Sequence, residues 1–87
     1  MKEYDVIYYS RAEKDLSMIN KKEAKVIFQK ISQLKQDPHP QMSIKLKGNE
    51  YYRLRSGNYR AIYQIDEINN KVIVIAVKHR SEAYLNL

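Results

Sequence analysis

Residues 51–63 decide the fold of this chain and read Tyr51-Tyr52-Arg53-Leu54-Arg55-Ser56-Gly57-Asn58-Tyr59-Arg60-Ala61-Ile62-Tyr63. Two strand-forming runs flank a Gly-Asn turn signal, so the stretch predicts a β-hairpin. With a two-residue loop, Arg55 lies directly opposite Arg60, and strand alternation puts Arg53 on the same surface. Like charges directly opposite each other destabilise a sheet, and the stretch contains no acidic side chain. The hairpin therefore favours a polyanionic partner.

The chain before the hairpin predicts a strand followed by two helices. Residues 3–9 alternate and are rich in β-forming side chains, which indicates a first strand. Ser10 with Glu13, and Asn20 with Glu23, give two capping signals, each opening a helix. Apolar residues at helical spacing follow the two caps: Ala12, Leu16 and Ile19 after the first, and Ala24, Ile27, Phe28, Ile31 and Leu34 after the second. The Asp-Pro-His-Pro sequence at 37–40 then ends the second helix.

The second half of the chain predicts a run of strands. We expect them at residues 43–47, 51–55, 59–66 and 71–78, the last being a continuous apolar run that suits an interior strand buried on both faces. We expect a short helical segment within 80–87. The predicted fold is one α+β domain over residues 1–87: an N-terminal strand, an antiparallel helical hairpin packed on a mainly antiparallel sheet, and that C-terminal segment.

Composition narrows the functional classes. The chain has 87 residues, a net charge of +6 and no cysteine, which excludes disulfides and thiolate chemistry. Residues 41–87 carry eight Lys or Arg against four Asp or Glu, whereas residues 1–40 carry eight against six. This bias favours a nucleic-acid partner, although basic surfaces also bind acidic proteins. His39 and His79 have no second ligand at metal spacing, so we expect no metal and no cofactor. No signal peptide or membrane span is apparent, and we expect a cytoplasmic protein.

The end of the last strand is the second candidate for chemistry. It reads Lys78-His79-Arg80-Ser81-Glu82-Ala83-Tyr84. Each residue alone has an ordinary interpretation: solvated charges, a surface histidine and a tyrosine anchoring the C-terminus. Arg80 has a structural alternative, pairing with Glu82 or Asp66. Together with the arginine-bearing hairpin, the group indicates a functional site.

These segments resemble the RelE/ParE toxin superfamily. The resemblance rests on Lys45-Leu46-Lys47-Gly48, on the pattern R-x-G-x-Y-R-x-x-Y within residues 55–63, and on the terminal H-R-x-x-x-Y group. It covers essentially the whole chain and implies a RelE/ParE-like fold and the toxin of a type II toxin–antitoxin pair. The H-R-x-x-x-Y group is similar to the RelE-type branch, which cuts mRNA in the ribosomal A site, whereas ParE-type members poison DNA gyrase.

The resemblance implies roles for individual residues. As catalytic residues it indicates Arg53, Arg60, Lys78, His79 and Tyr84. As substrate-binding residues we expect Lys45, Lys47, Tyr51, Arg55 and Arg80. Cleavage without a metal needs attack by the RNA 2′-hydroxyl, stabilisation of the charged phosphorane and protonation of the leaving 5′-oxygen. Arginines supply fixed donors for that charge, and a histidine titrates near neutrality.

Three functions remain open from the sequence. The first is a metal-independent, ribosome-dependent mRNA endoribonuclease that inhibits translation. The second is a ParE-like inhibitor of DNA gyrase without nuclease chemistry, and the third is a decayed toxin that serves only as an antitoxin-bound co-repressor. Some ribonuclease members carry a basic residue where Tyr51 stands, so one proton-transfer partner is in question. Each toxin hypothesis implies a cognate RelB-like antitoxin as a partner, with a heterotetramer of the two proteins as a candidate assembly. The first hypothesis adds mRNA on the ribosome as a partner.

Overall fold

The computed structural model describes residues 3–39, 43–45 and 51–82. The elements in chain order are β1 (Asp5–Tyr8), α1 (Ser10–Ser17), α2 (Lys21–Ser32), the 3₁₀ turn η1 (Gln33–Lys35), β2 (Ser43–Lys45), β3 (Tyr52–Ser56), β4 (Tyr59–Asp66) and β5 (Lys71–His79). Within these residues the strands form one sheet in the order β1-β5-β4-β3-β2. The β1–β5 pairing is parallel and the other pairings are antiparallel, so the predicted α+β fold with a mainly antiparallel sheet is confirmed.

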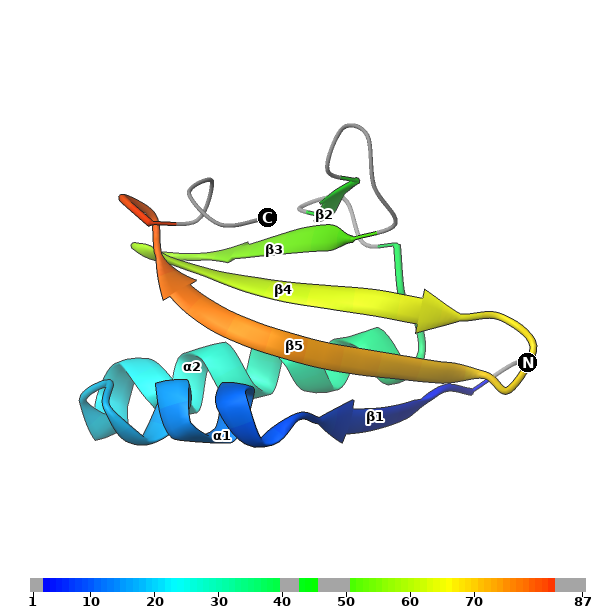
Figure 1. Cartoon of the computed structure of the whole chain (residues 1–87), viewed down its shortest axis with the longest axis horizontal. Helices are drawn as coiled ribbons and strands as arrows, with labels where there is room; N and C mark the ends of the chain where they lie inside the picture. The colour runs from blue at the N-terminus through cyan, green and yellow to red at the C-terminus, as the bar shows by residue number, and fades with distance from the viewer. Residues whose placement is uncertain (1–2, 40–42, 46–50, 83–87) are drawn as a thin grey trace.

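Both helices lie on one face of the sheet, and α2 runs back along α1 (Figure 1). At the start of α2 the side chain of Asn20 accepts a hydrogen bond from the Glu23 backbone N–H at 2.9 Å, as the capping signal predicts. The predicted cap at Ser10 is wrong. Ser10 is already the first helical residue of α1, and the extended Tyr9 precedes it without a side-chain cap bond. A backbone bond from Glu13 N–H to the Tyr9 carbonyl closes the first turn instead.

Most predicted elements are present with shifted ends. β1 is shorter than residues 3–9, β3 is displaced by one residue, and β5 extends to His79. The α-helix α2 ends at Ser32, and Leu34 is buried from within η1. Residues 80–82 form a turn after β5, and the rest of the predicted C-terminal helical segment lies outside the described residues.

The hairpin between β3 and β4 has the predicted two-residue loop. Arg55 pairs with Arg60 and Ser56 with Tyr59, which leaves Gly57 and Asn58 at the turn. Gly57 has a φ of +59°. A glycine in this conformation at the first loop position suits a two-residue hairpin, because the turn then follows the right-handed twist of the strands.

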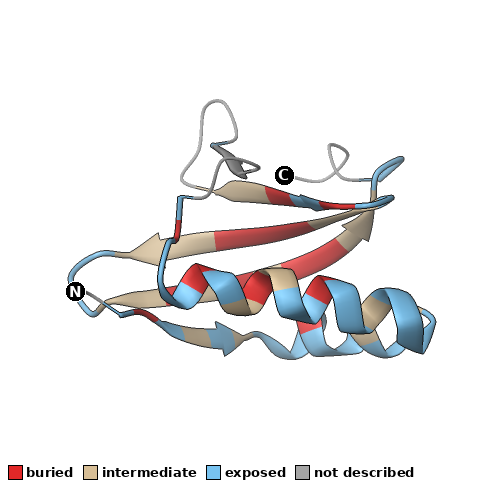
Figure 2. Ribbon diagram, turned by 180° about the vertical axis from the view of Figure 1, so that it is seen from behind, coloured by how far each residue is buried: buried red, intermediate tan, exposed pale blue. Residues whose placement is uncertain are grey.

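The core fills the space between the helices and the sheet. Its buried side chains are Tyr4, Ala12, Ile27, Ile31, Leu34, Leu54, Ala61, Tyr63, Val72, Val74 and Val77. Figure 2 shows the buried positions on the inner side of α2 and along the central strands, with the outer side of α2 exposed. On the opposite sheet face, Ile62 and Ala76 are paired and buried outside this core cluster, whereas Ile73 and Ile75 are only partly buried. Burial of β5 on both faces is therefore incomplete.

A β-bulge interrupts β5 at Ile75. Ile62 pairs with Ala76 while the next residue, Tyr63, pairs with Val74, so Ile75 is left without a partner on β4. One extra residue reverses the alternation of all side chains beyond it. Val74 before the bulge and Val77 after it therefore both enter the core, although they are an odd number of residues apart.

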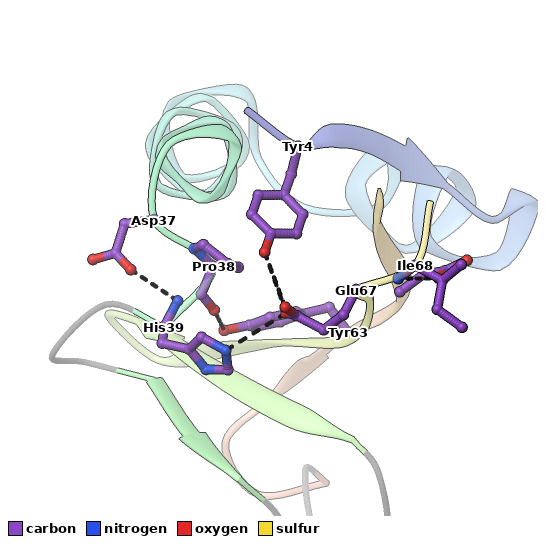
Figure 3. A network of polar contacts seen from close by, with 8 residues as sticks. Tyr4, Asp37, Pro38, His39, Tyr63, Glu67 and Ile68 are labelled. Carbon is purple, nitrogen blue, oxygen red and sulfur yellow. Dashed lines mark hydrogen bonds and ion pairs between the residues drawn. The ribbon is translucent and has the colours of Figure 1, made fainter. Parts of the chain in front are cut away.

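A polar network holds Pro38 and His39, which follow η1 (Figure 3). The hydroxyl of the buried Tyr63 donates to the Pro38 carbonyl at 2.8 Å. The next residue, His39, lies with Nε2 4.0 Å from Glu67 Oε1, and the same carboxylate accepts from the Tyr4 hydroxyl at 3.2 Å. The network ties the exit of the helices to the β4–β5 turn at the end of the sheet remote from the hairpin loop.

Candidate functional site

Three cations lie side by side across three strands on the sheet face away from the helices. Arg55 on β3 pairs with Arg60 on β4, and Arg60 pairs in turn with Lys78 on β5. Their strand neighbours Leu54, Ala61 and Val77 enter the core, so alternation directs the three cations to the other face. Arg55, Arg60 and Lys78 are called the cation row below.

Arg60 is at the centre of this charge. Partial burial from solvent, followed by the positive charges of Arg55, Arg53 and Arg80, lowers the pKa of the Arg60 guanidinium. The guanidinium folds back on the hairpin, where Nη1 donates to the carbonyls of Gly57 at 3.0 Å and of Tyr59 at 2.8 Å. Carbonyl oxygens thus offset part of the repulsion and hold the head group in place. A bound anion would relieve the remaining repulsion.

Arg53 lies on the same sheet face as the cation row, two residues before Arg55 on β3. It pairs with Ile62, which in turn pairs with Ala76. Arg53 is half-buried and its charge reaches Arg60. The predicted grouping of Arg53, Arg55 and Arg60 on one surface thus agrees with the strand register.

His79 lies apart from the cation row. It pairs with Tyr59 across β4 and β5, and the two rings meet edge to face with centroids 5.5 Å apart. Tyr59 packs against the core on the helix side, so His79 and Lys78 point to opposite faces. Nδ1 of His79 accepts the Ser81 backbone N–H at 3.3 Å. The same nitrogen lies 2.9 Å from Ser81 Oγ, a contact in which it donates or accepts according to the tautomer.

The remaining predicted site residues are dispersed. Lys45 pairs with Tyr52 and lines a cavity of about 290 Å³ with His39, Ile65 and Glu67, away from the cation row. Tyr51 is half-buried immediately before β3. Lys47 and Tyr84 lie outside the described residues.

Arg80 is exposed at the turn after β5. Its backbone N–H donates to the Asn58 carbonyl at 2.7 Å, which brings the strand exit over the hairpin loop. Asp66, one of the acids considered as its partner, accepts from Ile68 and Asn69 in the β4–β5 turn at the other end of β5. Arg80 therefore contributes charge to the hairpin end of the site.

Asp15 is a residue near this site that the sequence pattern did not single out. Its Oδ2 accepts a hydrogen bond from the Val77 backbone N–H at 2.9 Å. The two residues are 62 positions apart. In the sequence alone, Asp15 is one of several charged residues in a short predicted helix. No local signal marks such a contact.

Two features are absent from the described part of the chain. Residues 3–39, 43–45 and 51–82 hold no group of three His, Asp or Glu side chains placed to bind a metal ion. No helix within these ranges has the length and apolar character required to cross a membrane.

The fold and the cation row define a class of small α+β proteins with a basic sheet surface. The chain belongs to the family described as ParE toxin of type II toxin–antitoxin system, parDE, whose model matches residues 6–84. It is therefore a type II toxin of the RelE/ParE superfamily, as the sequence resemblance predicts. No curated protein sequence matches the chain.

Solved structures extend the comparison. The archaeal RelE–RelB complex from Pyrococcus horikoshii matches with a TM-score of 0.81 and 27% identity, over 95% of this chain and 100% of that chain. The intact RelBE toxin–antitoxin complex from E. coli matches with a TM-score of 0.75 and 26% identity, over 87% and 95%. A toxin–antitoxin complex from Mycobacterium tuberculosis has the same fold, with a TM-score of 0.80 and 23% identity over 90% and 99%.

Proposed function

We propose that this toxin is a metal-independent endoribonuclease that cuts mRNA in the ribosomal A site. The observation that carries the proposal is the cation row, three positive side chains in direct register across β3, β4 and β5. Such an arrangement lowers the stability of the sheet unless an anion neutralises it. Closely spaced phosphates of a nucleic-acid strand provide that neutralisation.

The cation row supplies positive charge for the dianionic intermediate of RNA cleavage. Attack of the 2′-oxygen on the adjacent phosphorus forms a dianionic phosphorane and then a 2′,3′-cyclic phosphate, with release of the 5′-oxygen. Arg60, flanked by Arg55 and Lys78, stabilises the developing charge, and Arg53 holds a neighbouring phosphate. Fixed donors of this kind are each worth about 2.7–4 kcal/mol in oxyanion holes. The carbonyls that hold Arg60 reduce the reorganisation needed on binding.

Proton transfer is assigned to His79, Tyr84 and groups of the ribosome. The His79 ring, when it carries a proton on both nitrogens, can give one to the leaving 5′-oxygen and return to the neutral imidazole. Because His79 faces away from the cation row, the scissile phosphate would have to lie at the strand exit, between the two faces. Arg80 and Tyr51 then serve as substrate-binding residues, and Lys45 and Lys47 bind more distant phosphates.

A cognate antitoxin of the RelB type neutralises the toxin in this proposal. The similar structure from Pyrococcus horikoshii is a complex of RelE with RelB, and the one from E. coli is the intact RelBE toxin–antitoxin complex. An acidic antitoxin segment placed over the cation row would compete directly with RNA, and two copies of each chain would form a heterotetramer. The toxin then acts in the cytoplasm, where translating ribosomes are found.

Inhibition of DNA gyrase is the second candidate function. It is favoured by the family match, because the matching model describes ParE toxins. A gyrase inhibitor would use the cation row for binding and would need no proton transfer from His79.

Inducible expression in a sensitive host distinguishes the two candidates. Transcript 5′-ends and chromosomal breaks are mapped before and after induction of the wild type, Arg60→Ala, His79→Ala and the control Lys25→Ala, which removes an exposed cation from α2. Cuts inside translated codons with the wild type and Lys25→Ala, lost with Arg60→Ala, support the nuclease. Loss with His79→Ala as well supports its role in proton transfer.

The opposite outcomes are equally specific. Growth arrest with intact transcripts and accumulating DNA breaks moves the assignment to gyrase. Harmless expression of the wild type at normal protein levels identifies a decayed toxin.

A further inference from the structure

The β-bulge in β5 decides which residue joins the cation row. Counted from Val74, regular alternation would send Ala76 and Lys78 into the core and Val77 to the sheet face away from the helices. The extra residue at Ile75 reverses this, so Val77 enters the core and Lys78 lies opposite Arg60. The site therefore depends on a local irregularity in one strand.

Two hydrogen bonds on the side of β5 away from β4 indicate the bulge independently of the β4 pairing. The Val74 carbonyl accepts from the Tyr9 N–H at 3.0 Å, so the polar backbone groups of Val74 face away from β4 toward β1. The Val77 N–H also faces away from β4, because it donates to Asp15. In a regular antiparallel strand, outward-facing backbone groups recur every second residue. The spacing of three between Val74 and Val77 fits only a strand with one residue inserted between them.

The partner of the Val77 N–H comes from α1 and not from a strand. β1 pairs with β5 only as far as Tyr8 and Val74, so β5 beyond that point has no strand on this side within the described residues. Asp15 covers the exposed position, and its Oδ2 lies 2.9 Å from the Val77 nitrogen. In the unbulged register the outward N–H at this point would belong to Ala76. The bond to Asp15 is therefore specific to one register.

We propose that Asp15 is a positioning residue that selects the bulged register of β5 and thereby places Lys78 in the cation row. Asp15 acts through the Val77 N–H and touches no substrate. The structural part of this inference stands on its own. Its consequence for RNA binding rests on the proposed function, in which Lys78 contacts a phosphate.

Backbone register is the first readout. Labelled full-length protein is studied by NMR as wild type, Asp15→Asn and Asp15→Ala. Asp15→Asn keeps an oxygen acceptor, so we expect it to retain Val77 amide protection and the Arg60–Lys78 cross-strand contacts. In Asp15→Ala we expect Val77 amide exchange to accelerate about tenfold or more, the Arg60–Lys78 contacts to weaken and Arg60–Val77 contacts to appear. Unchanged protection and unchanged Arg60–Lys78 contacts in Asp15→Ala would overturn the proposal.

The salt dependence of binding to a single-stranded RNA oligonucleotide is the second readout. Removing one phosphate contact lowers the slope of log K against log salt by about 0.7 for a single strand. We expect this loss in Lys78→Ala, a similar loss in Asp15→Ala, and no further loss in the double variant. A merely structural effect would instead add to that of Lys78→Ala.

Asp66→Ala is the matched control. Asp66 is also a carboxylate that accepts backbone N–H bonds, but it lies at the far end of β5, opposite Lys71. Both aspartate variants raise the net charge by one, so Asp66→Ala controls for the change in net charge. Because only Asp15→Ala is expected to displace Lys78, the slope should fall only in that variant. An equal fall in Asp66→Ala contradicts the proposal. If Lys78→Ala leaves the slope unchanged, the role of Lys78 in RNA binding fails, whereas the NMR register alone decides the role of Asp15.

Discussion

Arg60 on β4 lies directly opposite Lys78 on β5, and Arg55 on β3 lies directly opposite Arg60 on its other side. Three like charges in register are an unfavourable arrangement in an isolated sheet. The protein tolerates it with the help of the backbone carbonyls that hold Arg60. The first prediction follows from this repulsion.

Arg55→Glu should stabilise the fold. The substitution replaces a repulsive cross-strand pair with an attractive one, and such pairs differ by about 0.5 kcal/mol. Urea unfolding should show the gain as a higher midpoint with an unchanged slope. Lys25→Glu makes the same change of charge on the exposed side of α2 and should have a smaller effect. A lower midpoint for Arg55→Glu would show that repulsion in the cation row is already relieved by other groups.

Two tyrosine-to-phenylalanine variants should differ in their effect on stability. Tyr63→Phe removes the buried hydroxyl that donates to the Pro38 carbonyl at 2.8 Å, which should cost about 1–3 kcal/mol because that carbonyl loses its donor. The Tyr8 hydroxyl is shielded from solvent and has no hydrogen-bond partner within the described residues. Tyr8→Phe removes an unsatisfied group and should be neutral or stabilising. Equal losses in thermal unfolding of the two variants would contradict the assigned hydrogen bonding.

Helix capping supplies a third test. Asn20→Ala removes the side chain that caps α2 and should lower the free energy of unfolding by about 1 kcal/mol. Ser10→Ala should have little effect, since Ser10 is the first helical residue of α1 and α1 has no side-chain cap bond. Thermal denaturation of the two variants measures the difference directly. A comparable loss with Ser10→Ala would indicate a capping role for Ser10 that the structure does not contain.

Alkaline stability is the fourth prediction. Burial of the Tyr8 side chain, which stacks on Phe28 with ring centroids 6.0 Å apart, raises its pKa from 10.0 to about 12. Between these values the unfolded chain releases the proton while the folded chain keeps it, so stability is lost as pH rises. Below pH ~10 the contribution is fully present.

Denaturant titrations across this alkaline range compare the wild type with Tyr8→Phe. The other tyrosines give both proteins some common pH dependence, and the wild type should lose more stability than the variant. Parallel losses in the two proteins would mean that the Tyr8 hydroxyl titrates normally.

Local sequence signals determined much of this protein. The Gly-Asn pair at the hairpin loop, the Asn20 cap and the apolar spacing of α2 each depend on residues a few positions apart, so their structures follow from near neighbours. The opposition of Arg55 and Arg60 follows from the same loop length. The family resemblance, which also rests on short motifs, predicted the overall fold.

Only the tertiary structure decided how the end of β5 joins the site. The run from Val72 to Val77 is apolar at every position, so it gives no alternation from which a bulge could be predicted. The bulged strand lies between β4 on one side and Asp15 of α1, 62 residues from Val77, on the other. An extra residue in a strand exchanges the two faces of all residues beyond it. The bulge therefore places Lys78 beside Arg60 and His79 against Tyr59, and the local order Lys78-His79 does not predict which of the two faces each side chain takes.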